Sequence, residues 1–505
     1  MQGIGEWLVK RGQIAPEKEA LVDRDRRISY GQLNSRVNRL AGALAELGLK
    51  HGDRLGVLSY NCSEFVEIIF AAAKLGLMVV PLNWRLTASE LGFMLDDSET
   101  KVMIFDPELS GLAGEIKQTV SLDKLISLGA EPELGALPYE EVLSRQSGGE
   151  PEPAKPLDLG TPHIIMYTAG TTGKPKGAVL SQGASFWNAL NLQLAMEFSS
   201  DDRNLAALPM FHIGGIGLFT LPMLYAGGTV VIQRTFDSAE TLRLLAQEDI
   251  SLFFGVPAMF LFIIQNDGFK AEAFEKVRVV MSGGAPLPPS LVKEYHQAGI
   301  TLQQGFGMSE AAPSIATLSK DRALAKAGSI GRPVFHLNAR IVDHGGRPLG
   351  ANQVGELLIK GPNLMQGYWN RPQANEEAFV DGWFRTGDLA RMDEDGDLYI
   401  VDRKKDMFIS GGENVYPAEV EDAVYELEQV AEAAVIGVPD EKWGEVGKAF
   451  VVVKDGVSLS EAQCLDHLKT KLAKYKIPKS VVFLEALPRN AAGKVLKKTL
   501  REEQG

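Results

Sequence analysis

The chain has 505 residues, of which 45% are hydrophobic and 23% are charged, and its formal net charge is −13. This length exceeds the roughly 250–300 residues at which one hydrophobic core stops growing, so two or more domains are expected. The negative charge argues against nucleic acid or an anionic membrane as the main partner, because both require a basic surface. Any anionic ligand must therefore be held by local cationic groups.

Several features of the sequence predict a cytoplasmic protein. Cys62 and Cys464 lie far apart and suit buried free thiols in a reducing compartment. The N-terminal residues lack the apolar core of a signal peptide. The longest apolar run, 66–82, contains Lys74 and is shorter than the ~20 residues that a membrane-spanning helix needs. We expect no transmembrane segment, and at most a peripheral contact with a membrane.

Strands and helices are predicted to alternate up to about residue 255, and the same order occurs twice. The first unit has predicted strands 54–60, 77–82 and 101–106 and predicted helices 63–76 and 87–97. The second unit has predicted strands 203–210, 229–234 and 250–256 and predicted helices 214–228 and 238–248. We interpret this pattern as a duplicated α/β half, each half with a mainly parallel sheet. Ligands of such sheets bind at the carboxyl ends of the strands.

The pattern changes after about residue 328. Short alternating strands, separated by turn dipeptides, predict a small β-subdomain over 337–343, 355–361 and 397–402. A compact α/β unit follows, with predicted helices 417–428 and 459–473 and predicted strands 431–438, 448–454 and 480–486. We place the domain boundary at Asp402. The predicted fold is therefore α/β, with a large N-terminal domain (1–401) of two pseudo-repeated α/β sheets plus a small β-subdomain, followed by a small C-terminal α/β domain (402–505).

A loop rich in glycine, threonine and lysine lies within residues 165–181, IMYTAGTTGKPKGAVLS. Backbone N–H groups, hydroxyls and ammonium groups all favour oxyanions, so the loop is predicted to bind phosphate. It differs from the G-x-x-x-x-G-K-[ST] P-loop, because Thr168 replaces the first glycine and Pro175 replaces the hydroxyl residue. The alternative is a tight hairpin whose glycines serve turn geometry, but such a hairpin does not require the threonines and lysines.

Further motifs follow this loop in a fixed order. They are PMFHIGG (209–215), SGGAP (282–286), QGFGMSE (304–310), WFRTGD (383–388), DRKKDMFISGGENVYP (402–417) and PRNAAGKVLK (488–497). The ordered series resembles the adenylate-forming superfamily, which includes acyl-CoA synthetases, aryl-CoA ligases, firefly luciferase and the adenylation domains of peptide synthetases. The resemblance covers essentially the whole chain, and it is closest to bacterial medium- and long-chain fatty acyl-CoA synthetases.

The resemblance implies an acid–CoA ligase (AMP-forming) that works in two steps. A carboxylate first attacks the α-phosphorus of ATP and pyrophosphate leaves; the thiol of coenzyme A then takes the acyl group. The loop would close over the β- and γ-phosphates, where cationic and N–H groups offset the charge of two approaching anions. Ala169 stands where the family commonly has serine, which should tune ATP affinity rather than abolish binding. Lys494 would bridge the acid's carboxylate and the α-phosphate; without the motif it would be one solvated lysine in a basic tail.

The resemblance also implies roles for the nucleotide-binding residues. Glu310, with Thr168, would hold Mg²⁺ against the phosphates, Asp388 would accept hydrogen bonds from the ribose, and Phe306 would stack on adenine. Their alternatives are a helix-capping or solvated acid, a turn aspartate and a core aromatic residue. The ATP-binding residues are Thr168, Ala169, Gly170, Thr171, Thr172, Gly173, Lys174, Lys176, Gly284, Ala285, Pro286, Gln304, Gly305, Phe306, Gly307, Met308, Ser309, Asp388, Arg403 and Lys494. Those expected to act in catalysis are Lys494, Thr168, Lys176, Glu310 and His212.

The second step requires Lys494 to leave the site. The family achieves this by rotating a mobile C-terminal domain about the residue that matches Asp402, which brings the coenzyme A-binding face to the site. The residues implied to bind coenzyme A are Ser410, Gly411, Gly412, Glu413, Trp443 and Lys476. A packed, structural Trp443 is the alternative.

The acid pocket is expected to be apolar and uncharged. Its implied wall residues are His212, Gly214, Gly215, Val256, Met259, Gly305 and Met308. We expect Gly214, Gly215 and Gly217 to leave space for an extended or bulky acyl group. The resemblance to bacterial fatty acyl-CoA synthetases implies that the substrate is a medium- or long-chain fatty acid. The alternatives are an aryl- or o-succinylbenzoate-CoA ligase, or a stand-alone adenylation domain that loads a carrier protein. Beyond the carboxylic acid, ATP, Mg²⁺ and coenzyme A, the chain could form a homodimer.

Overall fold

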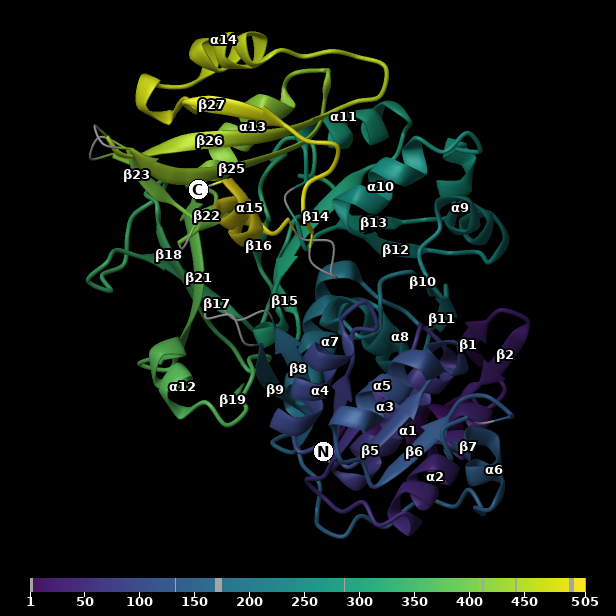
Figure 1. Ribbon diagram of the computed structural model, residues 1–505. Coiled ribbons are helices and arrows are strands. Elements are labelled where there is room, and N and C mark those ends of the chain that lie inside the picture. The colour runs from purple at the N-terminus through teal and green to yellow at the C-terminus, as the bar shows by residue number, and fades with distance from the viewer. Residues whose placement is uncertain are drawn as a thin grey trace.

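The computed structural model describes residues 3–131, 133–168, 175–285, 287–404, 406–410, 413–440, 443–489 and 495–504. In this part of the chain the strands form four sheets (Figure 1). Two large sheets account for most of the N-terminal part, and two smaller sheets follow. The α/β class and the division into a large and a small part are as predicted.

The first large sheet has eight strands in the order β19-β9-β8-β4-β3-β5-β6-β7. Their bounds are β3 (Arg54–Leu58), β4 (Met78–Pro81), β5 (Val102–Phe105), β6 (Lys124–Ser127), β7 (Leu137–Pro138), β8 (Pro162–Thr168), β9 (Lys176–Ser181) and β19 (Gly367–Tyr368). Strands β8, β4, β3, β5, β6 and β7 pair in parallel, whereas β9 pairs antiparallel with β8 and β19. Strands β3, β4 and β5 are buried along their whole length, as the near-continuous apolar runs of parallel strands require.

The second large sheet has nine strands in the order β16-β15-β14-β13-β12-β10-β11-β1-β2. Their bounds are β1 (Glu19–Asp23), β2 (Arg26–Ser29), β10 (Arg203–Ala206), β11 (Thr229–Ile232), β12 (Leu252–Gly255), β13 (Val279–Ser282), β14 (Leu302–Gly307), β15 (Ser314–Thr317) and β16 (Arg332–Pro333). Within this sheet the neighbouring strands β14, β13, β12, β10, β11 and β1 pair in parallel, whereas β2 at one end and β15 and β16 at the other pair antiparallel.

The predicted duplication is visible in the strand pairing. In the first sheet β3 pairs in parallel with the next two strands, β4 and β5, and in the second sheet β10 pairs in the same way with β11 and β12. The N-terminal hairpin β1–β2 interrupts this order, because Leu21 lies opposite Val230 and so joins the second sheet rather than the first. The equivalent strands β3 and β10 are linked by Asn61, whose amide donates to the carbonyl of Leu208 at 2.9 Å and accepts from the nitrogen of Met210 at 2.7 Å.

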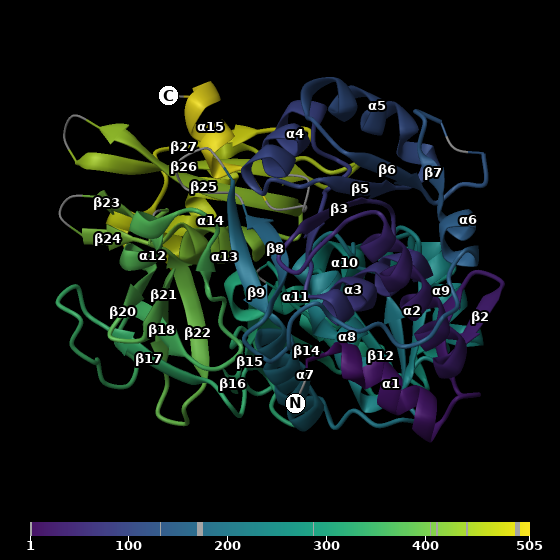
Figure 2. The ribbon, with the colours of Figure 1, turned by 90° about the horizontal axis from the view of Figure 1, so that it is seen from below.

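Helices cover both sheets. Their bounds are α1 (Gly5–Ile14), α2 (Tyr30–Glu46), α3 (Ser63–Leu75), α4 (Ala88–Asp97), α5 (Ser110–Thr119), α6 (Tyr139–Ser144), α7 (Gln182–Met196), α8 (Thr220–Ala226), α9 (Ser238–Gln247), α10 (Pro257–Ile264), α11 (Pro289–Gln297) and α12 (Pro372–Ala378). Helix α3 contacts β4 and β8 of one sheet and β1 of the other, so it lies between the two sheets (Figure 2).

The position of α3 explains the long apolar run noted in the sequence. Every residue of α3 is buried, including Glu67 and Lys74. Their charges are paired: Arg36 lies 2.6 Å from Glu67, and Lys74 lies 2.6 Å from Glu150, as buried charges require. Among the described residues, the helices are all too short or too polar to cross a membrane.

Two smaller sheets follow. The β-subdomain consists of β17 (Asn338–Val342), β18 (Gly355–Lys360), β20 (Phe379–Val380), β21 (Trp383–Met392) and β22 (Leu398–Arg403). The C-terminal unit consists of β23 (Phe408–Ser410), β24 (Glu413–Val415), α13 (Pro417–Tyr425), β25 (Val430–Asp440), β26 (Gly444–Val453), α14 (Glu461–Lys471), β27 (Ser480–Phe483) and α15 (Lys497–Gln504). The large N-terminal core includes Leu398 and packs against Ile400, whereas the C-terminal unit has cores of its own, one of which begins at Phe408. The boundary at Asp402 lies between these cores and stays a prediction.

A single side chain on α7 stabilises the middle of the molecule, and its removal should lower stability. Asn188 is 1% exposed; its amide donates to the carbonyl of Gly217 at 2.6 Å and accepts from the nitrogen of Ser314 at 3.0 Å. Asn188→Ala leaves both buried backbone groups without this partner, so we expect the free energy of unfolding to fall by about 2–4 kcal/mol. Urea denaturation measures the change. The matched control on the same helix, Gln193→Ala, loses one 3.5 Å hydrogen bond and should change stability by less than about 1 kcal/mol; equal losses for the two variants would contradict the assignment.

Candidate active site

Predicted adenine- and acid-binding residues meet at the carboxyl edge of the second sheet. Strands β12, β13 and β14 are parallel neighbours, with Gly255 opposite Ser282 and Ser282 opposite Gln304. Val256 and the Gly283–Gly284 turn follow the ends of β12 and β13, and they lie beside Gly305, where β14 continues and pairs with β15. Gly284 has a φ of +82°, and a Cβ atom there would lie 3.6 Å from Val256. The register thus assembles, from three strands, the edge that the sequence predicted as a binding site.

The end of β14 presents the second group of predicted residues. Gln304 and Ser309 are buried, and Phe306 and Met308 pack partly buried against the core. Gly307 has no room for a side chain, because a Cβ atom there would lie 2.2 Å from the carbonyl oxygen of Pro313. This close approach of β14 and β15 leads directly to Glu310, which is 7% exposed in the short helix Ser309–Ala311.

The base of the glycine-rich loop belongs to the first sheet. Thr168 ends β8, Lys176 begins β9, and the two residues lie opposite each other in the hairpin. The Thr168 hydroxyl donates to the carbonyl of Lys176 at 3.4 Å. The hairpin alternative and the phosphate-binding interpretation both require this pairing, so the pairing does not decide between them.

Tyr368 connects this hairpin to Glu310, and the sequence analysis did not single it out. The Lys176 ammonium lies 5.4 Å from the centre of the Tyr368 ring. The Tyr368 hydroxyl donates to Glu310 Oε1 at 2.9 Å. Tyr368 reaches this place because β19 pairs with β9, with Tyr368 opposite Ala178, and strand pairing over that sequence distance has no local signal. One aromatic side chain thereby contacts a cation from the first sheet through its ring and a carboxylate from the second sheet through its hydroxyl.

His212 lies in the loop after β10 and is exposed. Its Nδ1 atom accepts a hydrogen bond from the backbone nitrogen of Gly214 at 3.1 Å. A nitrogen that accepts cannot carry a proton, so this geometry favours the neutral tautomer with the proton on Nε2. The imidazole can thus donate one hydrogen bond from a fixed orientation. Met259, another predicted wall residue, is buried on α10.

The glycines beside His212 do not leave the open space that was expected. A Cβ atom on Gly215 would lie 2.2 Å from the carbonyl oxygen of Pro209, and one on Gly217 would lie 2.8 Å from that of Ala312. Backbone therefore fills the space next to Gly215 and Gly217. For Gly214 the nearest atom is His212 Nδ1 at 3.3 Å. The reason given for an extended acyl group is therefore wrong for Gly215 and Gly217, whereas wall roles for Gly214 and Gly215 stay predictions.

The predicted ribose-binding residue is buried in the β-subdomain. Asp388 is 1% exposed on β21 and lies opposite Arg403 on β22. Its backbone nitrogen donates to the Thr386 hydroxyl, which in turn donates to the carbonyl of Leu357 at 2.8 Å. Gly387 between them has a φ of +73°, a conformation that favours glycine. The T-G-D sequence is therefore a tight bend within a strand.

The predicted coenzyme A residues lie in the C-terminal unit. Ser410 is buried on β23, whereas Glu413 is exposed and Trp443 is 48% exposed. The Lys476 ammonium lies 2.6 and 2.8 Å from the two carboxylate oxygens of Glu419. Other predicted residues lie outside the described part of the chain, namely Ala169, Gly170, Thr171, Thr172, Gly173, Lys174, Pro286, Gly411, Gly412 and Lys494, together with the side chain of Arg403.

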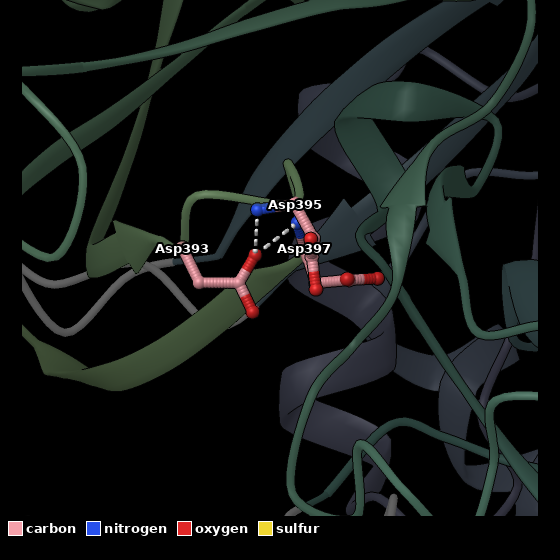
Figure 3. Close-up of side chains that lie close together, drawn as sticks. All are labelled: Asp393, Asp395 and Asp397. Atoms are coloured by element: carbon pink, nitrogen blue, oxygen red, sulfur yellow. Dashed lines mark hydrogen bonds between the residues drawn. The ribbon is translucent and has the colours of Figure 1, made fainter.

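The residues at Glu310 fit a magnesium ion. The Tyr368 hydroxyl donates a hydrogen bond to one carboxylate oxygen of Glu310, which leaves the other oxygen as a hard ligand. Phosphate and water oxygens ordinarily complete the coordination of Mg²⁺. Within the described ranges, three or more potential metal ligands converge in one place only: Asp393, Asp395 and Asp397 in the turn between β21 and β22. Figure 3 shows Asp393 turned toward the backbone nitrogens of the other two, at 3.0 and 2.9 Å.

Protein cations already neutralise this aspartate cluster. Lys326 Nζ lies 2.7 Å from both Asp393 and Asp395, and Arg322 pairs with Asp397. Although burial opposes it, the hydrogen bond from Lys326 lowers the pKa of Asp393 to about 2. The cluster therefore attaches the segment after β15 to the β21–β22 turn by ion pairs, and Glu310 remains the better candidate for a metal.

Comparison with known families and proteins gives consistent matches over the whole chain. Residues 8–369 match the AMP-binding enzyme family, and residues 419–494 match the AMP-binding enzyme C-terminal domain. Similar curated proteins are a feruloyl-CoA synthase from Amycolatopsis (40% identical over 504 residues, 100% of this chain and 99% of the relative) and an indoleacetate–CoA ligase from Aromatoleum aromaticum (41% over 499 residues, 99% and 98%). A long-chain-fatty-acid–CoA ligase from Mycobacterium tuberculosis is 38% identical over 505 residues, 100% of this chain and 99% of that protein.

Solved structures match the fold closely. ATP-bound MatB from Rhodopseudomonas palustris gives a TM-score of 0.90 at 31% identity, covering 99% of this chain and 98% of that one. The same protein in its apo form gives 0.79 at 32% identity with the same coverage. The o-succinylbenzoate-CoA synthetase from Bacillus subtilis, in complex with ATP and magnesium ion, gives 0.87 at 33% identity and covers 98% of each chain. The described arrangement is thus more similar to the ATP-bound than to the apo form of MatB.

The packing at Gly215 generates a test of the loop that carries His212. Gly215→Ala should lower the free energy of unfolding by at least about 2 kcal/mol, because the added carbon has no room beside Pro209. Gly214→Ala is the matched control one residue away, where the nearest atom is 3.3 Å from the added carbon, and it should cost less than about 1 kcal/mol. Thermal and urea denaturation measure both variants. A Gly215→Ala protein as stable as Gly214→Ala would show that the space beside Gly215 is open after all.

Proposed function

Because the chain belongs to the AMP-binding enzyme family, we propose that it is an ATP-dependent acid–CoA ligase, which forms an acyl-adenylate with release of pyrophosphate and then a thioester with coenzyme A. The observation that carries the proposal is the meeting of Lys176, Tyr368 and Glu310. It brings the lysine at the base of the glycine-rich loop together with the carboxylate that we assign to the metal, from two separate sheets. Its relatives with 38–41% identity over nearly their whole length are named CoA ligases or CoA synthases.

In the first step, the residues at the two sheet edges have complementary tasks. Lys176 and the Thr168 hydroxyl face the β- and γ-phosphates and offset their charge while the acid's carboxylate approaches. Glu310 holds Mg²⁺, which neutralises the phosphates when bound. Adenine lies between Phe306 and the turn at Gly284, and Asp388 accepts hydrogen bonds from the ribose. Lys494 orients the carboxylate against the α-phosphate.

We propose that the substrate is an aromatic carboxylic acid that carries no charged group other than the reacting carboxylate. The described wall residues Val256, Met259 and Met308 are apolar, and backbone fills the space beside Gly215 and Gly217 that was expected for an extended or bulky acyl group. The feruloyl and indoleacetate ligases also support an aromatic acid. A medium- or long-chain fatty acid is the second candidate, supported by the relative from Mycobacterium tuberculosis.

The experiment is acid-dependent AMP formation, with and without coenzyme A, across straight-chain, aryl, arylacetic and o-succinylbenzoic acids. We expect the highest kcat/KM with an aromatic acid and a requirement for coenzyme A in turnover. Activity that rises with aliphatic length would keep the reaction and overturn the substrate. AMP release that depends on a carrier protein instead of coenzyme A would overturn the acceptor, and no AMP with any acid or acceptor would overturn the proposed function.

Lys494→Ala tests the assignment of the first step. We expect acyl-adenylate formation to fall by at least about 100-fold, because a positioned charge at the reacting phosphate is lost. Thioester formation from a supplied acyl-adenylate should change little. Lys498→Ala is the matched control, since Lys498 is an exposed lysine of the same basic segment, 3.6 Å from Glu502, and it should leave both steps unchanged. Equal loss of both steps in Lys494→Ala would contradict the assigned role.

We also propose that the C-terminal unit rotates about Asp402 between the two steps. Asp402 is 6% exposed, and its Oδ2 atom accepts a hydrogen bond from the nitrogen of Ala418 at 2.9 Å. Ala418 lies in the first turn of α13, where free N–H groups favour a carboxylate. The side chain at the end of β22 thus caps the first helix of the C-terminal unit in the arrangement described here. The lower TM-score with apo MatB supports a second arrangement.

Once the unit has rotated, Ser410, Glu413, Trp443 and Lys476 would contact coenzyme A. The cytoplasmic location and the oligomeric state stay predictions.

Asp402→Pro tests the hinge. Proline fixes φ near −65°, so this variant should slow thioester formation from supplied acyl-adenylate while pyrophosphate release continues. Asp402→Ala is the control, because it removes the cap on α13 but leaves the backbone free; it should cost about 1 kcal/mol of stability and keep both steps. Single-turnover assays of the two steps measure the difference. Lost pyrophosphate release with surviving thioester formation would show that the hinge lies elsewhere.

A further inference from the structure

Tyr368 makes the two contacts that join Lys176 to Glu310, and none of the motifs singled out in the sequence includes it. Its hydroxyl donates to Glu310 Oε1 at 2.9 Å, and the Lys176 ammonium lies 5.4 Å from the ring centre. An ammonium at this distance from an aromatic face is attracted to it. The side chain thus touches the carboxylate that we assign to the metal and the cation that we assign to the departing phosphates.

The backbone of Tyr368 is held from several directions. Its nitrogen donates to the Asn375 side chain at 2.6 Å, and its carbonyl accepts from the same amide at 3.1 Å. Gly367 leaves no room for a side chain, since a Cβ atom there would lie 2.9 Å from Asn375. On the other side, Trp369 donates to the carbonyl of Gly177 at 2.7 Å, next to Lys176. These contacts fix the backbone of Tyr368, so that its side chain extends toward Glu310 from a defined position.

Glu310 is held by the same segment. The nitrogen of Met365 donates to the carbonyl of Glu310 at 2.8 Å, and Asn363 donates to the carbonyl of Ala311 at 2.7 Å. With the backbone fixed, the remaining freedom of Glu310 is rotation about its side-chain bonds, which turns the carboxylate. The Tyr368 hydroxyl restricts that rotation, because it needs Oε1 as its acceptor.

The hydroxyl has a single proton to donate in a hydrogen bond, and Glu310 Oε1 accepts it at 2.9 Å. With Oε1 engaged in this way, the second carboxylate oxygen of Glu310 is left to coordinate a metal ion.

We propose that Tyr368 is a positioning residue: its hydroxyl orients the Glu310 carboxylate for Mg²⁺, and its ring orients Lys176 for the phosphates. This inference rests on the proposed function, because it assumes that Glu310 and Lys176 meet Mg²⁺ and ATP. The two roles use different parts of one side chain, so two substitutions separate them.

Tyr368→Phe removes the hydroxyl and keeps the ring. We expect the Mg²⁺ concentration needed for half-maximal ATP-induced thermal stabilisation to rise about tenfold, because a hydrogen bond to a charged group is lost. ATP binding at saturating Mg²⁺ should change by less than about threefold, since the ring under Lys176 remains. Mn²⁺ titration followed by electron paramagnetic resonance measures the metal directly and should show the same shift.

Tyr368→Leu removes both features. It should show the same metal shift as Tyr368→Phe and, in addition, weaker ATP binding at saturating Mg²⁺. The matched control is Tyr399→Phe, which removes a phenol hydroxyl that donates to another carboxylate, Asp393, at 3.3 Å. It should leave both midpoints unchanged.

The outcomes separate the possibilities. A lower melting temperature in Tyr368→Phe with an unchanged Mg²⁺ midpoint would make Tyr368 merely structural and overturn the proposal. A Leu variant that binds ATP as tightly as the Phe variant would overturn the role of the ring. These readouts do not need an acid substrate, so wild-type protein that binds Mg²⁺ and ATP but adenylates no acid would contradict the proposed function and leave this inference standing.

Discussion

The side chain of Asn61 makes three hydrogen bonds from the loop after β3 to the loops after β10 and β11: to the carbonyls of Leu208 and Gln233 and from the nitrogen of Met210. Since β3 and β10 are the equivalent central strands of the two halves, this one amide joins the carboxyl edge of one half to that of the other. The loop it holds continues to His212. The two sheets also share one hydrophobic core, with α3 between them, so the hydrogen bonds of Asn61 fix the carboxyl edges within an interface that apolar packing already holds together.

The electrostatics of the molecule follow from the same division. The chain is acidic overall, with a net charge of −13, yet the cation at the base of the glycine-rich loop lies 5.4 Å from the centre of an aromatic ring, and no carboxylate among the described residues forms an ion pair with it. Elsewhere, buried charges such as Glu67 and Lys74 are paired, because an isolated buried charge is costly. Under the proposed function, a local cation beside the carboxylate assigned to the metal would bind an anionic nucleotide without a basic surface.

Much of the fold could be predicted from the sequence because it depends on local periodicity. The alternation of strands and helices gave the two repeated halves, the β-subdomain and the C-terminal unit, and the ordered motifs placed the site at the carboxyl ends of the strands. Pairing over long sequence distances has no such signal. The hairpin β1–β2 joins the second sheet through the register of Leu21 with Val230, and β19 joins the first through that of Tyr368 with Ala178. For the same reason Tyr368 was missed, and Gly215 was interpreted as open space although Pro209 fills it.

The separation of the cores bears on how one chain could serve two reactions. Phe408 and the residues after it pack among themselves, whereas Ile400 packs on the core of the large domain. A rotation between these residues would leave both cores intact and would exchange polar contacts such as the hydrogen bond from Ala418 to Asp402 and the 3.2 Å ion pair of Lys404 with Glu356. Each of these contacts is a single hydrogen bond or ion pair, so the proposed rotation would break few of them. Under that proposal the two arrangements would have similar energies, and bound nucleotide would select between them.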